Sequence, residues 1–162
     1  MTLVELMIAM VVLLVGITAS MAVVAVSMGG NGRNRQQSNS TVVAQMVSEK
    51  ISSVKANVAS PTVTITDCTG TTTTVTTTAG GSSLNTSGDI DFTQAAVSGY
   101  QLLYTDCGTS GRQVTYDVRW NITQSTNYVK LLVVSAKMQN AGTALRFFAL
   151  PVTIRTLVGQ GT

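Results

Sequence analysis

The first 28 residues form an uninterrupted apolar segment, and this segment restricts the possible folds more than any other feature of the chain. Met1–Met28 contains a single charged side chain, Glu5. As a helix it would be about 42 Å long, whereas the hydrocarbon core of a bilayer is about 30 Å thick. A secretory signal peptide opens with basic residues, and this segment has none. We therefore expect a helix that is able to span a membrane.

An ordinary membrane anchor leaves Glu5 unexplained. A carboxylate near the bilayer centre costs on the order of 3 kcal/mol, and less near a helix end, so a simple anchor stays an alternative. Intramembrane carboxylates usually pair with a cation. In a polymer of identical chains the nearest cation is the amino terminus of a neighbouring Met1. Such a pair would set the axial register between subunits.

The stretch MTLVELMI, Met1–Ile8, resembles the mature N-terminus of type IV pilins and the related pseudopilins. In that family a peptidase removes a basic leader, the first mature residue is N-methylated, and the fifth is glutamate. The resemblance thus assigns N-methylation to Met1 and subunit registration to Glu5 and Thr2. The family's first residue is most often Phe, so Met1 departs from the pattern. The implied fold is α+β, with a long N-terminal helix whose second half packs against an antiparallel sheet, and no cofactor is implied.

Glycines follow the apolar segment and predict a hinge at residues 29–32. Many pilins carry a helix breaker near positions 14 and 22, where this chain has Leu14 and Ala22. Gly16 is the nearest substitute, and each glycine weakens a helix by about 1 kcal/mol relative to alanine. The later hinge glycines are Gly29, Gly30 and Gly32.

Beyond the hinge, apolar residues at three- and four-residue spacing predict an amphipathic helix over residues 33–60 that packs under a sheet. The stripe consists of Val43, Met46, Val47, Ile51, Val54 and Val58, and Pro61 should end the helix.

We expect a threonine-rich region of loop and strand over residues 61–107. Its low-complexity part, residues 61–87, has too few apolar side chains for a packed core and should be exposed strand and loop. By the family resemblance, Thr71, Thr72, Thr73 and Thr74 are candidate O-glycosylation sites. Cys68 and Cys107 each end a Thr-Asp-Cys string. An even cysteine count behind an export-type N-terminus favours a disulfide, which would contribute about 4 kcal/mol.

Residues 108–162 predict an antiparallel three-strand meander. Val114 to Ile122 alternate apolar and polar residues, Tyr128 to Met138 have an apolar centre, and a third strand covers Leu145 to Leu157. Pro151 places that strand at an edge, since proline donates no ladder hydrogen bond. This region weakly resembles the C-terminal sheet of V-type minor pilins.

Charge and composition argue against catalysis. The chain lacks histidine, so no nucleophile, general base or metal constellation is visible. Asp89 and Asp91 could bind calcium, but two carboxylates do not supply the six or more oxygen ligands that calcium needs. We therefore favour a solvated loop at these residues over a calcium site. Tyr116 and Trp120, two strand positions apart on one face, are expected in the core and not in a base-stacking site.

The net charge of +3 is concentrated in residues 108–162, which hold six basic side chains and one acidic one. The basic residues are scattered singly, which favours solvated strand faces over a polyanion site. These residues are Arg112, Arg119, Lys130, Lys137, Arg146 and Arg155.

The resulting expectation is a structural subunit of a type IV pilus and not an enzyme. The resemblance implies identical subunits as partners, together with a prepilin peptidase, a platform protein and an assembly ATPase at the inner membrane. The subunit would lie in the inner membrane before assembly and in a surface filament afterwards. Two alternatives share the anchor: a pseudopilin of a type II secretion system, and a minor or competence-type pilin that captures DNA.

Overall fold

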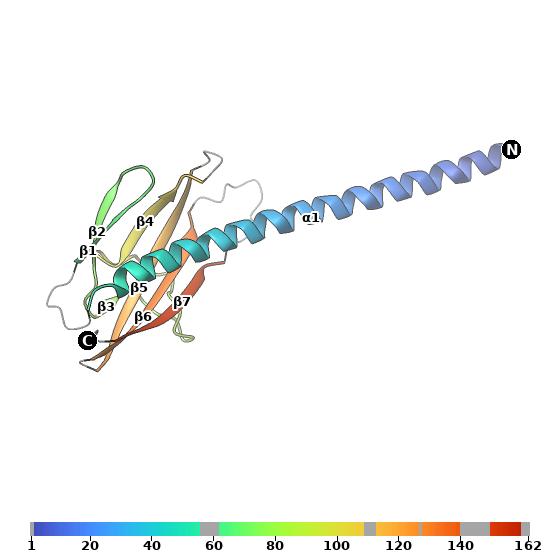
Figure 1. The fold of residues 1–162 in the computed structure, drawn as a ribbon. Coiled ribbons are helices and arrows are strands. Elements are labelled where there is room, and N and C mark those ends of the chain that lie inside the picture. The colour runs from blue at the N-terminus through green and yellow to red at the C-terminus, as the bar shows by residue number, and fades with distance from the viewer. Residues whose placement is uncertain (1, 56–61, 109–112, 127, 140–149, 160–162) are drawn as a thin grey trace. The chain divides into compact units, whose positions relative to one another are not determined.

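A computed structural model describes residues 2–55, 62–108, 113–126, 128–139 and 150–159, with the backbone alone for residues 29–33, 35 and 36. The chain divides into two compact units, Met1–Arg35 and Gln36–Thr162. The fold is α+β, as expected: helix α1 (Leu3–Ser52) precedes an antiparallel sheet. Figure 1 shows the helix and the strands by label.

The described sheet has five strands, with β3 (Gly80–Gly81), β5 (Val114–Thr126), β6 (Val129–Met138) and β7 (Val152–Gly159) in that order. β4 (Gln101–Asp106) pairs with the first half of β5, and β3 pairs with the second half of β5 along the same side. β5, β6 and β7 form the expected meander, with β7 at the edge.

The sheet and the second half of α1 share one core. Val43, Val47 and Ile51 of the helix are buried against the even-numbered residues of β5 and β6, including Trp120 and Leu132. Strand alternation places these even-numbered residues on one face, and the predicted apolar stripe supplies the helix side. Within residues 36–55 of the second unit, α1 therefore covers one face of the sheet (Figure 1).

The second face of the sheet is covered by the segment 82–100. Val133 of β6 and Ile90 of this segment are both buried, although neither belongs to the core beneath the helix. Asn121 donates a hydrogen bond to the Ser82 carbonyl (2.8 Å), and Arg155 donates one to the Ser87 carbonyl (2.7 Å). Burial of β6 on both faces explains its unbroken apolar centre.

Gly81 allows β3 to approach β5 closely. Its φ of +134° is rare for residues with side chains, and a Cβ at this position would collide with the carbonyl oxygen of Trp120. This strand, only two residues long, therefore depends on glycine.

The helix departs from the expected boundaries in two places. Its backbone stays helical through residues 29–32, because glycine lowers helix propensity without forbidding the helical backbone. At the other end α1 stops at Ser52, several residues before Pro61. The hydroxyl group of Ser53 donates a hydrogen bond to the backbone carbonyl of Lys50. Such local serine bonds compete with helix continuation. Residues 56–61, with Val58, lie outside the described part.

The threonine-rich region is more ordered than its composition suggests. β1 (Thr62–Thr66) and β2 (Thr72–Thr76) form an antiparallel hairpin, and Ile65 and Val75 are buried in the core. The region contributes these two apolar residues to the core of the larger sheet, because strand alternation gathers them on one face of the hairpin.

The C-terminal strands also differ in detail from the expectation. β5 continues through Thr126, beyond the expected strand residues Val114 to Ile122, with a register irregularity between Gln124 and Thr126. β7 begins at Val152, after Pro151; residues 140–149 lie outside the described part. β4 was not anticipated as a strand.

Candidate functional site

The N-terminal part of α1 is apolar around its whole circumference. Leu3–Met28 has a mean hydropathy of 2.6, is long and apolar enough to cross a membrane, and none of it is buried within the described protein. A helix that is apolar on every side requires an apolar environment, either a membrane or other helices. Most of the exposed large hydrophobic side chains among the described residues lie on this surface.

Two hydroxyl groups inside this segment are bonded within the helix. The Thr18 hydroxyl donates to the carbonyl oxygens of Leu14 and Val15, and the Ser20 hydroxyl donates to that of Gly16 (2.8 Å). These bonds satisfy the hydroxyl donors without water, which makes both residues compatible with an apolar environment. Gly16 lies inside the helix, and a Cβ added there would meet nothing within 4 Å, so this glycine leaves a shallow notch and no break.

Glu5 lies in the first turn of α1, where the helix dipole favours a negative charge. Its backbone N–H donates to the Thr2 carbonyl (3.1 Å), so Thr2 is the N-cap residue that precedes α1. The Glu5 side chain is exposed, and the described residues give it no ion-pair partner. Met1, the expected N-methylation site, lies outside the described residues.

Cys68 and Cys107 form the expected disulfide, with Cα atoms 5.9 Å apart. It ties the β1–β2 turn to the end of β4. The turn is ordered by Asp67, whose Oδ1 accepts hydrogen bonds from the backbone of Thr69 and Thr71. The Thr69 hydroxyl and these N–H groups lower the pKa of Asp67.

The four candidate glycosylation threonines differ in their positions. Thr72 and Thr74 lie opposite Thr66 and Thr64 on the exposed face of the hairpin, whereas Thr73 lies opposite the buried Ile65 and is half-buried. Thr71 is exposed in the turn. Modification of these residues stays a prediction.

The other sequence candidates are engaged in structural contacts. Asp89 pairs with Arg155 (3.0 Å), and Asp91 accepts hydrogen bonds from Thr93, so the two carboxylates face different partners. Tyr116 and Trp120 are buried in the core, as predicted. Among the described residues no group of three possible metal ligands occurs.

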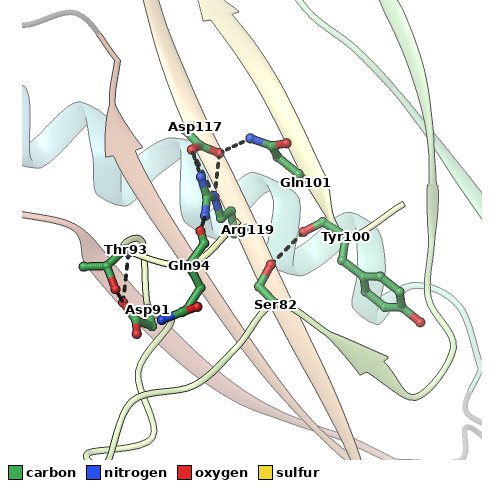
Figure 2. A network of polar contacts seen from close by, with 8 residues as sticks. All are labelled: Ser82, Asp91, Thr93, Gln94, Tyr100, Gln101, Asp117 and Arg119. Atoms are coloured by element: carbon green, nitrogen blue, oxygen red, sulfur yellow. Dashed lines mark hydrogen bonds and ion pairs between the residues drawn. The ribbon is translucent and has the colours of Figure 1, made fainter. Parts of the chain in front are cut away.

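Sequence reasoning missed a polar network on the sheet face beneath segment 82–100 (Figure 2). Asp117 accepts hydrogen bonds from Gln101 (2.8 Å) and from Arg119, and Arg119 also donates to the Gln94 carbonyl (2.8 Å). Arg119 lies over the Phe92 ring at 5.0 Å. The only sequence signal was the i, i+2 spacing of Asp117 and Arg119 on one strand face.

Two basic residues of the sheet, Arg119 and Lys130, are less exposed than expected, whereas Lys137 is exposed. The side chains of Arg119 and Asp117 are each 11% exposed, and Lys130 as a whole residue is 8% exposed. The expectation of solvated strand faces is wrong for Arg119 and Lys130, because the fold covers both faces of the sheet. Arg112 and Arg146 lie outside the described residues.

A groove on the helix side of the second unit was also missed. Val42, Val43 and Met46 of α1 form an apolar wall, Tyr104 of β4 faces them, and Asn39 and Asp106 are polar. Its volume is about 120 Å³. Val42 at its rim is 60% exposed.

Comparisons of the chain with family models, with curated proteins and with solved structures gave no match.

Proposed function

We propose that the chain is a structural subunit of a type IV pilus, assembled through its N-terminal helices. The observation that carries the proposal is the apolar surface of Leu3–Met28, with Glu5 as the one charged side chain. The arrangement of an N-terminal apolar helix, an antiparallel sheet and a disulfide is compatible with a pilin-like fold. The protein then acts by assembly and not by catalysis.

The apolar helix serves two environments in turn. Before assembly the inner membrane covers it, and after assembly the helices of neighbouring subunits do. Burial of apolar surface supplies most of the cohesion, at about 25 cal/mol per Å². Glu5, desolvated beside the Met1 amino terminus of a neighbour, supplies the register, since an unpaired carboxylate there would be costly.

Glu5→Val tests this role in the cell that produces the protein. We expect filament yield to fall at least about tenfold, because loss of a paired buried charge costs more than about 1.4 kcal/mol per contact. Filaments sheared from the surface are imaged and identified by mass spectrometry. Asp91→Asn is the control, since it also removes one carboxylate charge, but in segment 82–100, where Asp91 accepts hydrogen bonds from Thr93.

Normal filament yield from Glu5→Val would contradict the proposed register. Wild-type assemblies that stay short and periplasmic would indicate a pseudopilin instead. Capture of DNA is the weaker alternative, because Arg119 and Arg155 are engaged with Asp117 and Asp89. Salt-sensitive DNA retention by the protein would support it.

A further inference from the structure

The groove formed by Asn39, Val42, Val43, Met46, Tyr104 and Asp106 combines apolar walls with negative charge. Asp106 lines it, and Asp67 lies near enough to Tyr104 to affect its ionisation. Burial raises the pKa of Tyr104, and both carboxylates raise it further. The described pairings give neither Asp67 nor Asp106 a cationic partner. A side chain with an apolar stem and a cationic end fits this chemistry.

The opposite end of the same unit carries exposed lysines. Ile51 and Val54 lie against Lys130 and Val158, which places the end of α1 near the start of β6. Lys50 and Lys55 are exposed there and have no acidic partner among the described residues, although Glu49 is their exposed neighbour in sequence. Along the helix, Asn39 and Lys50 are about 16 Å apart.

We propose that this groove receives the lysine-bearing end of α1, residues 49–55, from a second copy of the chain. The occupant is identified by charge complementarity, with Asp67 and Asp106 on one surface and Lys50 and Lys55 on the other. Two different surfaces meet in such a contact, so it is heterologous. Heterologous contacts build an open helical polymer when the rotation between copies does not close into a ring. The inference rests on the proposed filament subunit and names residues of the second unit that would meet between neighbouring copies.

A charge series on the full chain tests the contact. The protein is purified in detergent, polymerised by detergent removal, and the critical concentration is measured by pelleting. Asp106→Asn keeps the oxygen that accepts the Gly108 N–H bond but removes the charge. We expect the critical concentration to rise about two- to fivefold, the size of an exposed ion pair. Asp91→Asn, an equal charge loss in segment 82–100, should change it less than about twofold.

Charge reversal gives the decisive comparison. Asp106→Lys and the double variant Lys50→Glu/Lys55→Glu should each impair polymerisation, and their combination should return the critical concentration to within about twofold of wild type. Circular dichroism and thiol titration verify the fold and the disulfide of each variant. An unrescued combination, or equal behaviour of Asp106→Asn and Asp91→Asn, would overturn the contact.

Photo-crosslinking identifies the occupant directly. Benzoylphenylalanine at Val42 should crosslink filaments to a peptide containing residues 49–55 of another copy. A crosslink to any other peptide, or none within intact filaments, would refute the proposal. A wild-type chain that never polymerises would contradict the proposed filament subunit itself. A critical concentration that these variants leave unchanged would contradict this contact alone.

Discussion

Single residues of the second unit show how burial changes side-chain chemistry. Tyr116 is buried on the helix side of β5, where Asn39 of α1 reaches its hydroxyl. Burial raises the pKa of Tyr116 and Asp106 adds to this effect, whereas the hydrogen bond with Asn39 opposes it. The phenolate form is therefore disfavoured in the folded protein. The contribution of Tyr116 to the free energy of unfolding should be fully present below pH 10, the ordinary tyrosine pKa, and should be lost as the pH rises through the raised pKa of the folded state.

Tyr116→Phe tests this linkage. The unfolded chain releases the tyrosine proton more readily than the folded chain, so the wild type loses stability above pH 10 by a route that the variant lacks. We expect the difference in unfolding free energy between wild type and variant to shrink between pH 8 and pH 11. Urea unfolding followed by circular dichroism measures it. A difference that is constant across this range would contradict the assigned cause.

At the scale of elements, the β1–β2 hairpin is a separate two-stranded sheet that depends on few connections. An isolated hairpin is marginal in water. Ile65 and Val75 bury its inner face, Trp120 donates a hydrogen bond to the Thr76 carbonyl (3.1 Å), and the disulfide ties its turn to β4. The disulfide is the only covalent connection among these.

Replacing both cysteines by serine should destabilise the protein by about 4 kcal/mol, because the disulfide closes a loop with a sequence separation of 39 residues. Trp120 is the only tryptophan and is fully buried, so its emission during urea unfolding reports on this core. Thr64→Ser/Thr74→Ser, on the exposed hairpin face, is a control expected to change stability by less than about 0.5 kcal/mol. A loss below about 1 kcal/mol for the cysteine variant would show that packing alone holds the hairpin.

At the scale of the whole molecule, the two compact units have different requirements. Leu3–Met28 buries nothing within the described protein, whereas Gln36–Thr162 contains a core of its own. The apolar helix therefore has to be covered by a membrane or by partner helices, and it contributes nothing to the packing around Trp120. The second unit should keep its fold when the first is removed.

A fragment of residues 33–162, which contains the entire second unit, should be monomeric and folded without detergent. Gel filtration, blue-shifted Trp120 emission and cooperative thermal unfolding measure this. The full chain, which carries the exposed apolar helix, should need detergent under the same conditions. Aggregation of the fragment, or non-cooperative unfolding, would show that residues before 33 contribute to the core.

The sequence by itself determined the apolar helix, the meander and the disulfide, because each depends on a local or periodic signal. Residues 1–28 are apolar whatever surrounds them, Val114–Ile122 alternate with period two, and two cysteines allow a single pairing. The α+β class followed from these signals and from the resemblance of Met1–Ile8 to pilins. The predicted C-terminal end of the helix was less accurate, because the backbone after Ser52 is set by local hydrogen bonds such as that of Ser53.

Only the tertiary structure decided which polar residues are covered and which surfaces stay open. From the sequence alone, Arg119 and Asp117 are two polar residues on one face of a strand. In the structure, segment 82–100 covers them. The groove at Val42 brings residues of α1 together with Tyr104 and Asp106 of β4, which come much later in the chain. Such contacts depend on long-range packing, for which local periodicity carries no signal.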